Sequence, residues 1–150
     1  MRPRQNLDLS SFLPSIFRNL AEGISASLSR SYSGEDINLT VTEWRILLQL
    51  AEHQSLSASQ IVSNTTMDKS KVSRALSSME GNGVVQRTPD PTDHRRQSLQ
   101  LTDYGLHLYR QLVPRALEWE KELIQGLDVS EYRDLLYLLD KLKQRLQAMN

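Results

Sequence analysis

One segment of the sequence, residues 67–80, carries hydroxyl and cationic side chains in a spacing that suits contact with nucleic acid. If its apolar residues form the buried face of a helix, then at about 100° per residue Ser70, Arg74 and Ser77 point directly outward. Arginine can donate two hydrogen bonds to a guanine edge, and serine can bond to bases or phosphate. The alternative is an ordinary solvated helix face. The outward set, with three cations and no anion between residues 69 and 78, is Lys69, Ser70, Lys71, Ser73, Arg74 and Ser77.

A second charged segment, PDPTDHRR, follows a predicted strand at 84–88 and precedes a predicted strand with the sequence SLQLT. At the tip of such a hairpin, the adjacent Arg95 and Arg96 could enter a DNA minor groove, where the potential is most negative. Asp93, two residues before Arg95, could brace the guanidinium of that arginine through a charge-assisted bond. Hairpin tips are also charged simply because they are solvated, so this segment supports DNA binding only together with the preceding helix.

The neighbouring elements are those that would position these two segments. Ser57 is expected to be the N-cap of a short helix before the helix at 67–80, and Gly81 and Gly83 flank its expected stop. Two helices joined by a short turn and followed by a hairpin form a winged helix-turn-helix. The sequence therefore predicts a mainly α fold with a small β-hairpin wing, of the α+β class. Further helices are predicted at 9–32, from Thr42 onward, at 102–126 and at 129–148.

The same segments resemble the MarR family of bacterial transcriptional regulators. DPTDHRRQSLQLTDYG is similar to the wing signature of that family, which is an Asp, one residue, an Arg, five residues and then Leu-Thr. Asp93, Arg95, Leu101 and Thr102 fit this signature without a gap. DKSKVSRALSSMEGNGVVQR resembles the recognition helix, its closing glycine and the first wing strand of the family, and TEWRILLQLAEH resembles its second helix. The resemblance spans about residues 40–105.

This resemblance implies a function and a set of partners. The family implies a homodimer that binds a pseudo-palindromic operator in double-stranded DNA, usually as a repressor, and is often released by a small aromatic or phenolic ligand. It also assigns Arg95 to the minor groove and Asp93 to its support. The outward residues of the helix at 67–80 would then read the major groove, with Lys69 as a phosphate contact.

The terminal helices carry more apolar surface than one chain of this size can cover. The helix at 102–126 has two apolar stripes, and the helices at 9–32 and 129–148 add one each. Exposed, this surface would promote aggregation, whereas a two-fold dimer would bury it. We therefore expect an N-terminal dimerisation helix in residues 1–35, a winged helix-turn-helix DNA-binding lobe in 36–102 and C-terminal dimerisation helices in 103–150. The alternative is a self-contained monomeric bundle.

Polar residues on otherwise apolar helices are the candidates for a small-molecule site. Arg18 and Ser27 lie on the first predicted helix, and Arg45 lies on the second. An arginine with a neighbouring hydroxyl could bind the carboxylate of an aromatic acid. The alternative for Arg45 is an ion pair with a neighbouring Asp or Glu. The sequence does not name the ligand.

The composition argues against several other classes of protein. The chain has 150 residues with 18 Lys and Arg against 18 Asp and Glu, which excludes a uniformly basic coat like that of a histone-like DNA-wrapping protein. The absence of cysteine excludes disulfides, thiolate zinc sites and cysteine-based redox sensing. His53, His94 and His107 show no paired spacing on one helix, so neither a metal site nor a cofactor is expected.

Catalysis and membrane insertion are not expected either. No nucleophile–base set, phosphate loop or pair of carboxylates at catalytic spacing stands out, so an enzyme is not expected. No apolar run approaches the roughly 20 residues that span a bilayer, and no apolar region follows the basic residues at the N-terminus. We therefore expect a cytoplasmic protein. The alternative function is a winged-helix module that binds protein, without a small-molecule effector.

Overall fold

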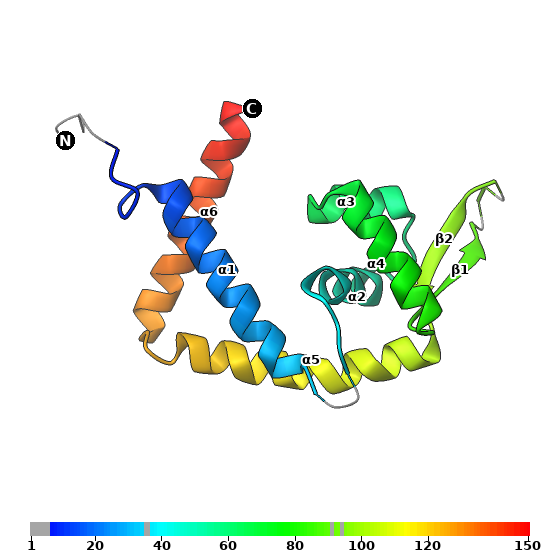
Figure 1. Cartoon of the computed structure of the whole chain (residues 1–150). Coiled ribbons are helices and arrows are strands. Elements are labelled where there is room, and N and C mark those ends of the chain that lie inside the picture. Colours follow the sequence, from blue (N-terminus) through cyan, green and yellow to red (C-terminus); the bar gives the residue numbers. More distant parts are fainter. Residues whose placement is uncertain (1–6, 35–36, 91, 94) are drawn as a thin grey trace. The chain divides into compact units, whose positions relative to one another are not determined.

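The computed structural model describes residues 7–34, 37–90, 92–93 and 95–150 (Figure 1). The chain folds into helices and one antiparallel hairpin, so the mainly α architecture with a small β-hairpin wing that the sequence predicts is confirmed. The elements are α1 (Leu13–Tyr32), α2 (Val41–His53), α3 (Ala58–Thr65), α4 (Lys69–Gly81), β1 (Val85–Pro89), β2 (Gln97–Leu101), α5 (Asp103–Ile124) and α6 (Val129–Met149).

The chain divides into two compact units, residues 1–116 and residues 117–150. In the first unit, α2 contacts α3, α4 and β2, while α4 also contacts α3 and β1 (Figure 1). These elements share one hydrophobic core, which fixes the helix-turn-helix and the hairpin relative to each other. Its largest fully buried side chains are Tyr32, Ile46, Leu47, Leu50, Ile61, Val72, Leu76, Met79, Leu99 and Leu112.

Side-chain caps set the starts of the two helices in the helix-turn-helix. Ser57 is the N-cap of α3, as expected, and exchanges hydrogen bonds with Gln60 in a capping box. Helix α4 begins at Lys69, whereas the sequence predicts a start at residue 67. The reason is that Asp68 is its N-cap, and the Asp68 carboxylate accepts a bond from the backbone N–H of Lys71 at 3.0 Å.

Helix α1 begins later than the periodicity predicts, at Leu13 instead of residue 9. The apolar pattern continues through residues 9–12, but the carboxylate of Asp8 accepts hydrogen bonds from the backbone N–H and hydroxyl of Ser10 and from the hydroxyl of Ser11. Such local bonds compete with helix formation. Proline is well tolerated in the first helical turn, and Pro14 lies there.

The far end of α1 is anchored to α2 by two aromatic rings. Tyr32, the last residue of α1, stacks on Trp44 with ring centroids 4.9 Å apart and an angle of 18° between the ring planes. Tyr32 is buried, and this burial raises the pKa of its hydroxyl. The pair ties the end of α1 into the core of the first unit.

The hairpin is held by backbone pairing on two sides of β2. Strand β1 pairs with β2 in an antiparallel register that places Val85 opposite Leu101 and Pro89 opposite Gln97. On the other edge of β2, Leu99 exchanges two backbone hydrogen bonds, of 3.1 and 2.8 Å, with Leu56. Leu56 lies in the loop between α2 and α3. The base of the wing is therefore fixed to the helix-turn-helix.

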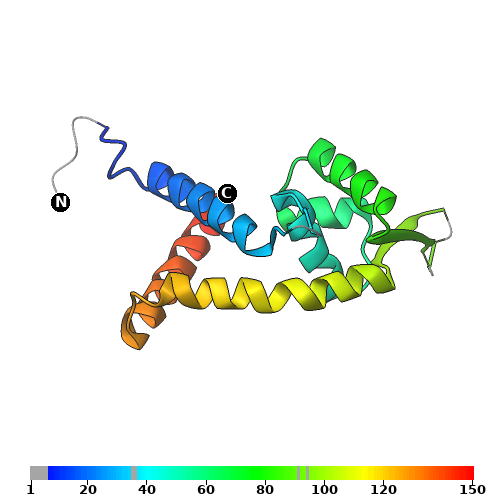
Figure 2. The ribbon, with the colours of Figure 1, turned by 60° about the horizontal axis from the view of Figure 1, so that its bottom comes forward.

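Helix α5 starts in close contact with the base of the hairpin (Figure 2). The Thr102 hydroxyl donates to the carbonyl of Gly83 at 2.5 Å and accepts from the backbone N–H of Gly105 at 3.0 Å. A Cβ atom at Gly105 would lie 2.2 Å from the carbonyl oxygen of Val84. Only glycine allows this approach, because any side chain would overlap the backbone of the wing.

The second unit consists of the end of α5 and α6, which begins with a capping box between Asp128 and Glu131. No residue of α6 is buried. Its apolar residues remain solvent-accessible in the single chain. The most exposed apolar residues of α6 are Val129, Leu136, Tyr137, Leu138, Leu146 and Met149.

None of the helices in the described residues is long and apolar enough to cross a membrane.

Candidate nucleic-acid interface

The outward face of α4 is polar and solvent-exposed along its whole length. The buried positions of the helix are Val72, Ala75, Leu76 and Met79, as the apolar periodicity predicts. The opposite face carries the hydroxyl and cationic side chains that the sequence singles out. The structure exposes all of Lys69, Ser70, Lys71, Ser73, Arg74 and Ser77.

The cations of this face are electrostatically uncompensated. Within the described part of the chain, no carboxylate forms an ion pair with Lys69, Lys71 or Arg74. Ser77 donates its hydroxyl proton back to the carbonyl of Ser73 at 3.1 Å. Its oxygen can still accept a bond from a ligand. The face therefore offers positive charge and hydroxyl groups to an anionic surface.

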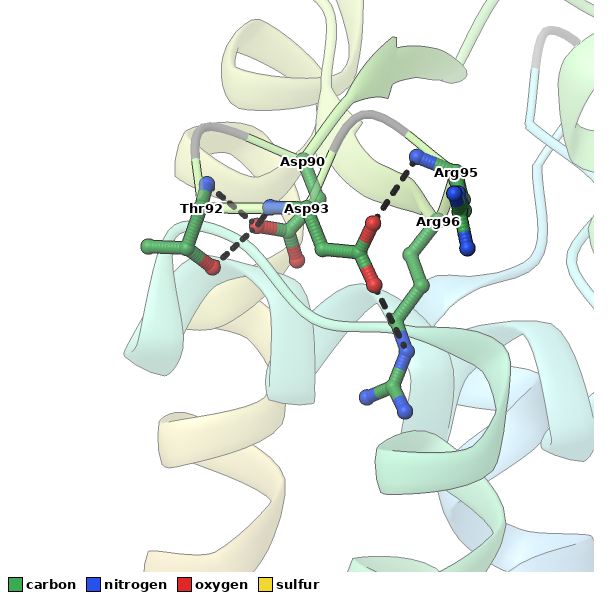
Figure 3. Close-up of polar contacts among 5 residues, drawn as sticks. All are labelled: Asp90, Thr92, Asp93, Arg95 and Arg96. Atoms are coloured by element: carbon green, nitrogen blue, oxygen red, sulfur yellow. Dashed lines mark hydrogen bonds and ion pairs between the residues drawn. The ribbon is translucent and has the colours of Figure 1, made fainter.

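Two aspartates at the tip of the wing accept hydrogen bonds from neighbouring described residues (Figure 3). One oxygen of the Asp90 carboxylate accepts hydrogen bonds from the backbone N–H and hydroxyl of Thr92, at 2.8 and 2.7 Å, and from the backbone N–H of Asp93 at 3.3 Å. These bonds, chiefly that from the Thr92 hydroxyl, lower the pKa of Asp90 below its ordinary value. His94 lies outside the described residues.

Asp93 contacts a different arginine side chain from the one expected. Its carboxylate accepts a hydrogen bond from the backbone N–H of Arg95 at 3.1 Å, and its other oxygen lies 3.6 Å from Nε of Arg96 (Figure 3). The two-residue spacing therefore closes an Asx turn on the backbone of Arg95 instead of bracing its guanidinium. The Arg96 side chain, one residue further on, is the one that pairs. Both arginine side chains are exposed.

Comparison with known proteins identifies relatives of the segment that carries these residues. A family model described as MarR family matches residues 39–96, which include α2, α3, α4 and the wing tip. The HTH-type transcriptional repressor NicR of Pseudomonas putida is 27% identical over 107 residues, which cover 71% of this chain and 68% of NicR. Over this segment the chain is similar to the MarR family. This family and NicR are transcriptional regulators and not enzymes.

Solved structures extend this MarR-family likeness beyond the matched segment. A MarR/EmrR family transcriptional regulator from Acinetobacter sp. ADP1 is 25% identical, with a TM-score of 0.83 over 95% of this chain and 99% of that one. BpsR of Bordetella bronchiseptica, whose DNA binding is regulated by 6-hydroxynicotinic acid, is 22% identical, with a TM-score of 0.79 over 92% of this chain and 97% of that one. The second likeness shows the fold alone.

The structure does not gather the three candidate residues for ligand binding into one site. Arg18 and Ser27 are nine residues apart on α1, which places them on opposite faces of the helix at about 100° per residue. Among the residues that the structure describes, Arg45 forms no ion pair with a carboxylate, which was the alternative. Its Nη2 donates to the carbonyl of Thr65, at the end of α3, at 2.6 Å.

One side chain that the sequence does not single out links the helix and the wing of the candidate interface. Arg87, on β1, donates from Nε to the carboxylate of Glu80, on α4. Together with Lys69 and Ser73, Arg87 also lines a hollow of about 300 Å³ between α3, α4 and β1. No local spacing rule pairs residues seven apart across a helix end and a turn, so only the folded hairpin could reveal this contact.

Proposed function

We propose that this protein is a homodimeric, sequence-specific DNA-binding transcriptional repressor that a small aromatic or phenolic acid releases from its operator. The observation that carries the DNA-binding part is the outward face of α4. Its cations are exposed among hydroxyl groups, and no carboxylate of the described residues forms an ion pair with them. The other face of this helix is buried. A helix of this kind fits the major groove, where Arg74 can bond a guanine edge and the serines can bond bases or phosphate.

The wing provides the second contact in this proposal. Arg95 and Arg96 are exposed at the tip, where the carboxylates of Asp90 and Asp93 accept hydrogen bonds from the backbone N–H groups of Asp93 and Arg95. Guanidinium groups are attracted to the narrow minor groove, where the potential is most negative. We assign Arg95 to that groove. The pairing of Asp93 with Arg96 leaves the Arg95 side chain outside that ion pair.

We propose that the dimer forms through the terminal helices, in residues 1–35 and 103–150. Its support is the apolar surface that the single chain leaves uncovered. Leu13, Leu20 and Ile24 of α1 are exposed, and α6 buries no residue. On α6, the leucines recur at steps of four and three, which gives one continuous stripe of the kind that pairs helices. Those leucines are Leu135, Leu139, Leu142 and Leu146.

The effector part of the proposal is supported by BpsR, whose DNA binding 6-hydroxynicotinic acid regulates. Arg18, Ser27 and Arg45 are the residues that we propose to test in this chain. Because Arg18 and Ser27 lie on opposite faces of α1, one ligand is expected to depend on only one of them. A regulator of this kind acts on the chromosome, so we propose that the protein lies in the cytoplasm.

A salt titration of duplex binding tests the proposal. Fragments bound by the full-length protein are selected from a random duplex pool, and affinity for a selected duplex and for a scrambled one is measured across a range of salt. We expect tighter binding of the selected duplex, and a steep fall in affinity with salt for both, because each phosphate contact releases counterions. Equal, weak and salt-independent binding of both duplexes would favour the protein-binding module instead.

A further inference from the structure

Among the described residues of the wing tip, Asp90 makes more of the hydrogen bonds than Asp93, Arg95 or Arg96. A single carboxylate oxygen receives the backbone N–H and hydroxyl of Thr92 and the backbone N–H of Asp93. Its own backbone N–H donates to the carbonyl of Arg96 at 2.9 Å, across the hairpin. Asp90 therefore holds both the first turn of the tip and the point where the two strands separate.

A second turn follows directly and depends on the first. The carbonyl of Asp93 accepts a bond from the backbone N–H of Arg96 at 2.9 Å, and the Asp93 carboxylate holds the backbone N–H of Arg95 at 3.1 Å. Because Asp90 fixes the backbone N–H of Asp93, it also fixes the residue from which both arginines are held (Figure 3). The two turns therefore form a continuous series of hydrogen bonds from Asp90 through Asp93 to the backbone N–H groups of Arg95 and Arg96.

We infer that Asp90 is a positioning residue for DNA binding, which orders the wing tip so that Arg95 and Arg96 are already placed when DNA arrives. This inference rests on the proposed function, in which the wing enters the minor groove. A tip that is ordered before DNA binds loses less conformational entropy on docking than a flexible tip does. Its affinity for DNA is therefore higher than that of a flexible tip with the same contacts. An anion at this place also repels phosphate, so electrostatics alone gives Asp90 the opposite effect on affinity.

Two substitutions with the same change of charge separate these effects. Asp90→Ala removes the negative charge and the hydrogen-bond acceptor, whereas Asp90→Asn removes the charge but keeps the Oδ1 acceptor for all three donors. On a duplex selected by the wild-type protein, we expect Asp90→Ala to bind roughly 3- to 10-fold more weakly. We expect Asp90→Asn to bind at least as tightly as the wild type. Unchanged or tighter binding by Asp90→Ala, or an equal loss in both variants, would overturn the inference.

A double-substitution background shows whether Asp90 acts through the arginines. The variant with Arg95→Ala and Arg96→Ala is expected to bind the selected duplex more weakly than the wild type, and adding Asp90→Ala to it is expected to cause no further loss. A further loss as large as that in the wild type would contradict a positioning role. If the double arginine variant itself binds like the wild type, the proposed role of the wing fails, and this outcome is distinct from a failure at Asp90 alone.

Discussion

Glu80, near the end of α4, and Arg87, on β1, are joined by a hydrogen bond of 2.5 Å from Nε of the arginine to the carboxylate. Both side chains are partly exposed, so the bond adds little to stability. Its importance is geometric. It joins the helix that we propose to read the major groove to the strand that leads to the wing tip. It therefore adds a side-chain contact that helps to hold the angle between the two proposed DNA contacts, which the shared hydrophobic core sets.

We expect Glu80→Ala to weaken binding to a selected duplex by roughly 2- to 5-fold, since an exposed ion pair contributes up to about 1 kcal/mol. Glu80→Gln has the same change of charge but keeps an acceptor for Nε of Arg87, so it should lose less. Affinities are measured by fluorescence anisotropy, with melting temperatures as a check on folding. Tighter binding by Glu80→Ala would mean that the freed Arg87 cation matters more than the fixed angle.

Gly105 tests the packing of α5 against the base of the wing. Gly105→Ala places a Cβ atom 2.2 Å from the carbonyl oxygen of Val84, so backbone must move. We expect a loss of about 1–3 kcal/mol in the free energy of unfolding, as for other overpacked sites. Gly81→Ala is the matched control, because a Cβ atom there meets nothing within 4 Å. Equal stabilities of the two variants in denaturant titrations would show that the close approach is not required.

The sequence predicted the elements better than the contacts between them. Ser57 as a cap and the two faces of α4 followed from short-range spacing, and the structure has both. The hydrogen-bond partner of Asp93 could not be predicted in this way. A carboxylate two residues before an arginine can accept a bond from the backbone N–H of that arginine as well as from its guanidinium. The bond from Arg45 to the carbonyl of Thr65 joins residues twenty apart in the chain, and only the tertiary fold brings them together.

The stripe of leucines on α6 tests the proposed dimer. Leu139→Glu adds a carboxylate to the centre of this stripe, and burying it in an apolar interface would cost more than the interface can offset. We expect this variant to sediment as a monomer and to lose tight operator binding. Ala148→Glu adds the same side chain nine residues away, on the opposite face of the helix. It should remain a dimer. A dimeric Leu139→Glu variant would place the interface elsewhere.

The hydrogen bonds at Asp90 also predict how the wing responds to pH. Because the bonds from Thr92 and Asp93, with a smaller contribution from the charge of Arg96, lower the pKa of Asp90 in the folded protein, its stabilising contribution is complete above its ordinary pKa of 3.8. That contribution is lost as pH falls through the lowered, folded pKa. The NMR shift of the Thr92 amide proton should therefore titrate with a midpoint below 3.8.

The Asp90→Asn variant is the control for this titration. It keeps the acceptor and has no carboxylate to protonate, so the transition at the Thr92 amide should disappear. A midpoint at or above 3.8 in the wild type would mean that the carboxylate is not held by these donors in solution.

The most direct test of the proposed function compares Arg74→Ala with Lys69→Ala on a selected duplex and a scrambled one. If Arg74 bonds a base edge, its loss should cost about 1–3 kcal/mol, or roughly 5- to 150-fold in affinity, on the selected duplex and far less on the scrambled one. Lys69→Ala should weaken both duplexes alike and reduce the salt slope by about one, as the loss of a phosphate contact does. Equal losses on the two duplexes for Arg74→Ala would contradict the assignment of this face of α4 to sequence recognition.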